Sequence, residues 1–185
     1  MIEKLLHKIA AALDKEKIPY IVIGGQAVLL YGNPRLTRDI DITLGIDTDQ
    51  FSVIEGICRR FKLKILSQNP EDFARQTKVL PAEDARSKMR VDFILSFSSY
   101  EKQAISRSKK VLVDHYPVSF VSLDDIIIHK MLAGRAIDEE DVKNLLIKNK
   151  AKLNLRYIRK WLKEFGSLDQ YKTLGQKFSE LLKRS

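Results

Sequence analysis

The fold of this chain is decided by one stretch, Ile21-Val-Ile-Gly-Gly-Gln-Ala-Val-Leu-Leu-Tyr-Gly-Asn-Pro-Arg-Leu-Thr-Arg-Asp-Ile-Asp-Ile-Thr-Leu44. The apolar run that ends at Ile23 predicts a strand, and the glycine pair after it predicts a turn. A short apolar helix is expected over residues 26–31, followed by a basic loop and a second strand. The stretch is therefore expected to form a strand-turn-helix-strand unit at the centre of the fold.

The second strand carries two carboxylates. Asp39 and Asp41 alternate with Ile40 and Ile42, which is the period of a half-buried strand. At about 3.3 Å per residue the two carboxylates lie about 6.6 Å apart on one face. Two bare carboxylates about 4 Å apart repel by about 4 kcal/mol at an effective dielectric constant near 20. We therefore expect a divalent cation, bound by oxygen ligands, to offset the repulsion.

The glycine pair supplies the other half of the expected site. Gly24 and Gly25 stand between a strand and a helix, where glycine lets backbone N–H groups approach a ligand closely. The N-terminus of the helix then favours an anion such as phosphate. A turn alone would explain a lone Gly-Gly pair. Together with the Asp-x-Asp pattern that follows, however, the pair suits phosphoryl or nucleotidyl transfer.

Several segments resemble a known family. Gly24-Gly25, the segment Arg35-Leu-Thr-Arg-Asp-Ile-Asp41 and the later Arg90-Val-Asp92-Phe-Ile resemble the nucleotidyltransferase superfamily of the DNA polymerase beta type. Within that superfamily the chain most resembles the AbiEii-like (abortive-infection toxin) branch and related small bacterial nucleotidyltransferases. The segment 122–141 also resembles that branch, in which a Lys, an Arg and two Asp recur on consecutive helices. The resemblance covers roughly residues 15–150.

The resemblance implies a role for each matching residue. Asp39 and Asp41 would hold Mg²⁺ or Mn²⁺ on a nucleoside triphosphate. Asp92 would complete the metal site and activate the attacking hydroxyl, and Lys130 would act as a phosphate or active-site ligand. The substrate-binding residues it implies are Gly24, Gly25, Arg35, Thr37, Arg38 and Arg135.

Most of these residues also have a purely structural interpretation. Asp92 alone would be a polar residue of an edge strand, and Arg35 and Arg38 would be surface charges. Lys130 lies among apolar helical positions, from which a lysine can extend its ammonium to solvent.

The remaining titratable residues are assigned structural roles. Asp138 and Asp141 are expected near the start of a helix, where the helix dipole favours a carboxylate. Cys58 is interpreted as a small buried apolar residue. His115 and His129 are interpreted as structural or exposed residues.

Composition restricts the classes of function. The chain has 185 residues, a net charge of +9 and a single cysteine, so an internal disulfide is excluded. Three histidines and that cysteine leave little for a zinc site. No apolar run is long enough for a membrane span, and the start lacks the pattern of a signal peptide, so a cytoplasmic protein is expected. The net charge favours RNA or nucleoside triphosphates as partners, and a solvated lysine-rich surface explains it equally well. The excess is concentrated in residues 143–185, which hold twelve Lys or Arg against three Asp or Glu.

The pattern predicts an α/β (α+β) protein with a mixed sheet flanked by helices. Strands are expected over residues 20–23, 39–43, 62–66 and 89–95, and a hairpin over 110–113 and 118–121. Pro81 to Ser87 is expected to be a polar loop. Helices are expected over residues 2–17, 47–61, 69–78, 98–106, 122–134, 138–149, 154–165 and 168–183. These imply a catalytic domain over residues 1–121 and a helical region over 122–185 packed on it.

Two classes of function are compatible with these residues. The first is a Mg²⁺-dependent nucleotidyltransferase whose acceptor is an RNA (such as tRNA), a protein or a small molecule. If the enzyme is toxin-like, a cognate antitoxin is a further expected partner. The second is a non-catalytic nucleotidyltransferase module that binds nucleotide, RNA or a partner protein. A P-loop NTPase and a Rossmann dehydrogenase are disfavoured, because neither glycine signature occurs in the chain.

Overall fold

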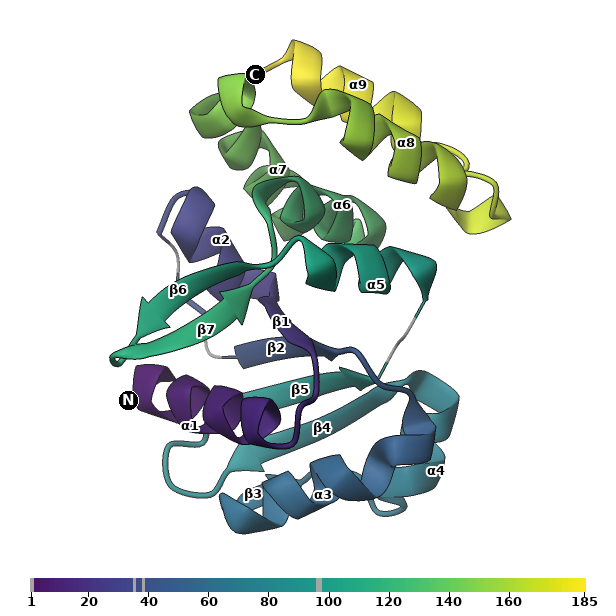
Figure 1. Ribbon diagram of the computed structural model, residues 1–185. Helices are drawn as coiled ribbons and strands as arrows, with labels where there is room; N and C mark the ends of the chain where they lie inside the picture. Colours follow the sequence, from purple (N-terminus) through teal and green to yellow (C-terminus); the bar gives the residue numbers. More distant parts are fainter. Residues whose placement is uncertain (1, 35, 38, 96–97) are drawn as a thin grey trace. The chain divides into compact units, whose positions relative to one another are not determined.

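The computed structural model describes residues 2–34, 36–37, 39–95 and 98–185. Strands and helices alternate in the first part of the chain, and only helices follow residue 121 (Figure 1). The predicted α/β class with a mixed, helix-flanked sheet is confirmed. None of the described helices has both the length and the hydropathy that crossing a membrane requires.

The chain forms two compact units. The first comprises Met1–Gln26 and Thr37–Val121, and the second comprises Ala27–Leu36 and Ser122–Ser185. Helix α2 (Gly24–Tyr31) therefore begins in the first unit and continues in the second.

The first unit is built on a seven-stranded mixed sheet. Its strands, in spatial order, are β3 (Leu63–Ile65), β4 (Val79–Asp84), β5 (Arg90–Leu95), β2 (Asp39–Leu44), β1 (Tyr20–Ile23), β7 (Tyr116–Phe120) and β6 (Lys109–Val113). Strand β2 is parallel to β5, and β1 is parallel to β7, while the other neighbours are antiparallel. Four helices contact this sheet. Helix α1 (Ile2–Lys15) contacts β7, and α3 (Phe51–Arg60) contacts β3. Helix α4 (Pro70–Thr77) contacts β4, and α5 (Ser99–Ser106) contacts β1.

The second unit consists of helices. Besides the later part of α2, it contains α6 (Leu123–Ala133), α7 (Ala136–Asn149), α8 (Leu155–Phe165) and α9 (Leu174–Lys183). Helix α6 starts at the N-cap Ser122, whose hydroxyl accepts a hydrogen bond from the Asp125 N–H, and it ends at the left-handed Gly134. Helix α6 contacts α7, α8 and α9, so it is the centre of this unit.

One predicted loop is a strand. The segment from Pro81 to Ser87 was expected to be a polar loop, but β4 runs through Pro81 to Asp84 between β3 and β5. The Pro81 carbonyl accepts a hydrogen bond from the Leu66 N–H, just beyond the end of β3. In an antiparallel pair the N–H and C=O of one residue point to the same side. The Pro81 nitrogen therefore points to the side of β3, at a position beyond the end of that strand. No ladder hydrogen bond is lost there, so the sheet tolerates the proline.

Two smaller differences concern helices. The helix expected from residue 47 begins as a 3₁₀ turn, Thr48–Gln50, with Asp47 as its N-cap, and continues as α3. The helix expected over residues 168–183 is a 3₁₀ turn, Asp169–Tyr171, followed by α9. The hairpin of β6 and β7 agrees with the prediction.

Candidate active site

Three carboxylates share one face of the central strands. In the parallel pair of β2 and β5, Asp41 lies opposite Asp92, and Asp39 lies opposite Arg90. Side chains of residues that are paired in register point to the same face of a sheet, and so do those two residues apart on one strand. The face that carries Asp39, Asp41 and Asp92 therefore carries Arg90 as well.

The opposite face of the same strands belongs to the core. Ile40, Ile42, Val91 and Phe93 are each 0% exposed. Burial of these four side chains fixes the register of both strands, because a slip by one residue would turn the apolar side chains outward. Strand β5 lies between β4 and β2, so the interpretation of Asp92 as an edge-strand residue is wrong.

The glycine pair lies against this polar face. Gly24 opens helix α2 with φ at +64°, in the left-handed region that favours glycine. A Cβ atom at Gly24 would lie 1.9 Å from Oδ2 of Asp41, and a Cβ atom at Gly25 would lie 2.4 Å from Oγ1 of Thr37. The first turn of α2 is therefore in close contact with both the carboxylate strand and Thr37.

The start of β2 is held by two side chains. The Thr37 hydroxyl donates a hydrogen bond of 2.7 Å to Oδ1 of Asp39. The Gln26 amide, from the first turn of α2, donates one of 3.3 Å to the Asp39 carbonyl. Thr37 was predicted to bind substrate, and here it contacts Asp39 and Gly25.

Arg90 is a site residue that the sequence did not reveal as one. Its Nε donates a hydrogen bond of 3.0 Å to Oδ1 of Asp92. This bond raises the pKa of Arg90, as do the negative charge of Asp92 and those of Asp39 and Asp41. The signal that could have found it is the spacing: Arg90 is two residues before Asp92 on the same strand, and therefore on the same face.

The donor set of this face suits a hard cation. Within the described ranges, no three Asp, Glu, His or Cys side chains are grouped closely enough to hold a metal ion by themselves. Mg²⁺ does not require such a cage, because it is bound by one or two carboxylates together with substrate phosphates and water. Asp39, Asp41 and Asp92 offer carboxylate oxygens on one face, which is the chemistry that this kind of site uses.

Arg35 and Arg38, which were predicted to bind substrate, lie outside the described residues.

Lys130 and Arg135 belong to an ion-pair cluster of the second unit. The Lys130 ammonium lies 2.7 Å from Oδ1 of Asp138 and 2.9 Å from Oδ2 of Asp141. The Arg135 guanidinium donates to both carboxylate oxygens of Asp138, at 2.6 and 3.2 Å. Burial raises the pKa of Asp138, but hydrogen bonds from Arg135 and Lys130 outweigh burial and hold it below the ordinary value.

One structural interpretation fails at this cluster and another is incomplete. The Lys130 side chain is 4% exposed, so it does not extend to solvent. Asp138 lies in the first turn of α7, where a carboxylate complements the helix dipole as expected. Both Asp138 and Asp141 are in addition buried acceptors of the Lys130 ammonium, which the helix dipole does not explain. The two aspartates neutralise a lysine that could not otherwise remain charged inside the helical unit. The catalytic role that the resemblance implies for Lys130 stays a prediction.

Comparison with known proteins gives a family. The profile of the family described as "Nucleotidyltransferase of unknown function (DUF6036)" matches residues 1–185. No curated protein sequence matches the chain.

Solved structures with the same fold are similar over nearly the whole chain. The solution structure of the antibiotic-resistance factor ANT(2'')-Ia has a TM-score of 0.62 at 17% identity, covering 96% of this chain and 97% of that chain. Its crystal structure with adenylyl-2''-tobramycin has a TM-score of 0.53 at 18% identity, covering the same shares, 96% and 97%. An antigenic nucleotidyltransferase-like protein from Paracoccidioides brasiliensis has a TM-score of 0.58 at 15% identity, covering 98% and 91%. At these identities the similarity shows the fold.

Proposed function

The chain belongs to the DUF6036 family of nucleotidyltransferases, and from that premise we propose that it transfers a nucleotidyl group from a nucleoside triphosphate to a hydroxyl acceptor, with Mg²⁺ or Mn²⁺. One observation carries the proposal. The first turn of α2, at Gly24, lies in contact with Asp41, which is paired with Asp92 on the neighbouring strand. A glycine-lined helix start beside paired carboxylates is suited to holding a phosphate chain and a cation together.

The glycine pair is proposed to bind the triphosphate. The absence of side chains at Gly24 and Gly25 lets the first turn of α2 lie directly against Asp41 and Thr37. The first N–H groups of α2 are proposed to bind the phosphate oxygens beside these residues. Those N–H groups have no partner within a helix and carry the positive end of the helix dipole. Thr37 would keep the Asp39 carboxylate oriented through the hydrogen bond that it already donates.

The three carboxylates are proposed to hold the cation and receive a proton. Asp39 and Asp41, with Asp92, would bind Mg²⁺ or Mn²⁺, which when bound neutralises phosphate charge and orients the reacting oxygens. The acceptor hydroxyl forms a bond to the α-phosphorus, the bond between that phosphorus and the β-phosphate bridging oxygen breaks, and pyrophosphate leaves. Asp92 takes the hydroxyl proton, which a carboxylate can do once it lies within hydrogen-bond distance.

Arg90 controls whether Asp92 is available. Its guanidinium is bonded to Asp92 at 3.0 Å, yet its side chain is 56% exposed, so it can turn away toward solvent or toward the phosphates. A guanidinium that moves from Asp92 to a phosphate would exchange one charge-assisted bond for another. Arg90 is therefore proposed to bind the triphosphate.

RNA is the acceptor that the charge of this chain favours. The net charge of +9 attracts polyanions, and residues 143–185 carry much of the excess. The structure of ANT(2'')-Ia with adenylyl-2''-tobramycin supports the alternative of a small-molecule acceptor, because that fold accommodates an adenylylated small molecule. The resemblance of residues 122–141 to the AbiEii-like branch supports a toxin role with a cognate antitoxin.

A labelling experiment tests the proposal. The protein is incubated with each α-³²P-labelled nucleoside triphosphate, with Mg²⁺ or Mn²⁺, and separately with total cellular RNA, cell lysate protein and a set of hydroxylated small molecules. We expect one acceptor class to become labelled, and the Asp92→Asn variant to lose about 10²–10⁴-fold of the rate. Asp72→Asn, an exposed carboxylate on α4 of the same unit, is the matched control. Equal labelling by the Asp92→Asn variant and the wild type would refute the catalytic assignment.

A nucleotide-binding module without transfer activity is the second candidate. The ion pair of Arg90 and Asp92 favours it, because the guanidinium occupies a carboxylate that catalysis requires. The same experiment separates the two candidates when triphosphate binding is measured in parallel. Binding without label transfer to any acceptor class would support the module.

A further inference from the structure

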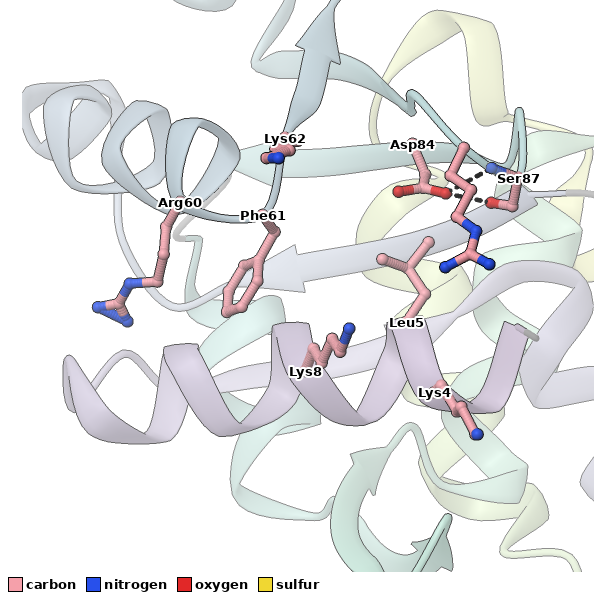
Figure 2. Close-up of a pocket in the computed structure, with 9 residues that line it drawn as sticks. Lys4, Leu5, Lys8, Arg60, Phe61, Lys62, Asp84 and Ser87 are labelled. Atoms are coloured by element: carbon pink, nitrogen blue, oxygen red, sulfur yellow. Dashed lines mark hydrogen bonds between the residues drawn. The ribbon is translucent and has the colours of Figure 1, made fainter.

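A basic pocket lies in the first unit, and none of its lining residues belongs to the candidate active site. Its volume is about 620 Å³, and α1, the junction of α3 with β3, and the turn between β4 and β5 form its walls. Its lining residues are Lys4, Leu5, Lys8, Arg60, Phe61, Lys62, Asp84, Arg86 and Ser87 (Figure 2). Pockets of about 300–1,000 Å³ are of the size that holds small-molecule ligands.

Five of the nine lining residues are cations, and most of them have no counter-ion. Within the part of the chain that the structure describes, the side chains of Lys4, Lys8, Lys62 and Arg86 form no ion pair. Arg60 lies 3.7 Å from Glu16, a partly exposed pair. Like charges around one pocket repel each other, and a pocket lined by one sign of charge raises the local concentration of the opposite ion.

The single carboxylate of the pocket is already compensated. Oδ2 of Asp84 accepts hydrogen bonds of 2.6 Å from both the N–H and the hydroxyl of Ser87. The hydroxyl bond lowers the pKa of Asp84, and the backbone N–H groups of Ser87 and Arg86 and the charge of Lys8 act in the same direction. Asp84 therefore shapes the turn between β4 and β5, and its charge cancels that of no more than one of the five cations.

The pocket also has an apolar part. Leu5 is buried and Phe61 is half-buried, and Figure 2 shows the Phe61 ring pointing toward α1, from which Lys8 rises in the opposite direction. The Arg60 guanidinium lies 5.8 Å from the Phe61 ring centroid. An aromatic ring among cations can stack on a flat base while the cations contact phosphates.

We propose that this pocket is an anion site for a ligand with a nucleobase and phosphate groups. Cations at Lys4, Lys8 and Arg86 contact the phosphates, and Phe61 contacts the base. The phosphates come from an RNA strand or from a free nucleoside triphosphate, and the test separates these sources. The proposal does not depend on the transfer reaction, because its residues are not those of the candidate active site.

Ligand binding is compared between a pocket variant and a control variant of the full chain. In the first, Lys8→Gln and Arg86→Gln are combined, which removes two pocket cations from different elements. The matched control combines Lys17→Gln and Lys64→Gln, two exposed lysines of the same unit outside the pocket. A second pocket variant, Lys4→Gln with Lys62→Gln, is used if the first fails to fold.

Affinity for a labelled single-stranded RNA oligonucleotide is measured by fluorescence anisotropy at several salt concentrations. If the source is RNA, the pocket variant binds roughly tenfold more weakly than the control variant. The slope of log affinity against log salt becomes shallower by about 1.4, since each phosphate contact on a single strand contributes about 0.7. The control variant changes the slope less.

Amide NMR spectra locate the ligand. The resonances of Lys62, Arg86 and Ser87 are followed while ATP or the RNA oligonucleotide is added, and those of Gly24 and Gly25 report the candidate active site separately. Shifts of the pocket amides with RNA alone identify RNA as the source, and shifts with ATP, weakened in the pocket variant, identify the free nucleotide. The proposal is overturned if neither ligand shifts them, or if the pocket and control variants bind both ligands equally.

Discussion

The α-carbon of Gly24 lies so close to Asp41 that a Cβ atom there would sit 1.9 Å from the carboxylate oxygen Oδ2. The glycine is therefore required twice, by its φ of +64° and by the contact with Asp41. The position of the start of α2 therefore depends on the position of the carboxylate strand β2 at Asp41. A change at one of the two residues displaces the other.

Gly24→Ala should destabilise the protein. A non-glycine residue in the left-handed region costs about 1–3 kcal/mol, and displacement of Asp41 adds to it. Gly56→Ala is the matched control, because nothing lies within 4 Å of a Cβ atom at Gly56, inside helix α3. That control should stabilise by about 0.5–1 kcal/mol. Urea unfolding of both variants checks this, and equal effects would mean that the contact with Asp41 is not restrictive.

Lys130→Met tests whether Lys130 holds the helical unit together. The variant leaves Asp138 and Asp141 buried without the lysine, and breaking a buried pair on one side costs about 3–5 kcal/mol. Lys143→Met is the control, since Lys143 pairs with Glu140 at the surface of α7, the helix that carries Asp138 and Asp141, and its loss costs less than about 1 kcal/mol. If both variants unfold at the same urea concentration, the Lys130 cluster does not stabilise the unit.

Asp138 should make stability depend on pH. Its folded-state pKa is below the ordinary value, so its charged form stabilises the fold above that value, near 3.9 for a free Asp. The contribution is lost as pH falls through the folded-state pKa. The free energy of unfolding of the wild type should therefore fall more steeply than that of Asp138→Asn between about pH 5 and pH 2. Parallel pH profiles of the two proteins would contradict the assignment.

The sequence predicted the centre of the fold because its local patterns agreed with the tertiary structure. The alternation around Asp39 and Asp41 predicted β2 with its carboxylates on one face. The glycine pair predicted a turn before a helix over residues 26–31, and the helix α2 begins at Gly24 itself. It failed at β4, since Pro81 is a strong signal against a strand, and only the early end of β3 makes the proline acceptable. The order of the strands could not be predicted either, because it depends on contacts between distant segments.

The sequence predicted that Asp39 and Asp41 share one face of a strand, but it did not reveal Arg90. Carboxylates on a strand are rare enough to be noticed, whereas Arg90 resembles any surface arginine until the register places it opposite Asp39 and beside Asp92. The burial of the Lys130 side chain could not be predicted from the sequence either. Its partners Asp138 and Asp141 lie on the next helix, and the turn at Gly134 that brings the helices together sets which residues meet.

Cys58 should be unreactive in the folded protein. Burial, followed by the charge of Glu55, raises the pKa of its thiol to about 12, so almost no thiolate exists near neutral pH. Reaction with a thiol reagent should proceed only as fast as the protein unfolds. Ser52→Cys, an exposed position on the same helix, should add a second thiol that reacts at once. Rapid labelling of Cys58 in the wild type would show that α3 opens locally.

Arg90→Gln should tighten the binding of a divalent cation. Arg90 places a positive charge beside Asp92, and its pKa is raised first by the hydrogen bond to Asp92 and then by the charges of the three site carboxylates. Two unit charges roughly 5 Å apart in a water-like dielectric interact by about 0.8 kcal/mol, which corresponds to about fourfold in affinity for a singly charged ligand and more for a divalent one. The water-like value applies because the Arg90 side chain is 56% exposed.

Mn²⁺ binding to the Arg90→Gln variant, followed by electron paramagnetic resonance without nucleotide, measures the change in affinity. Arg75→Gln, which removes an arginine paired with Glu71 on α4, should leave Mn²⁺ affinity as it is. Weaker Mn²⁺ binding by the Arg90→Gln variant would mean that Arg90 instead orients Asp92 for the cation, and binding that does not change would place the cation away from this face.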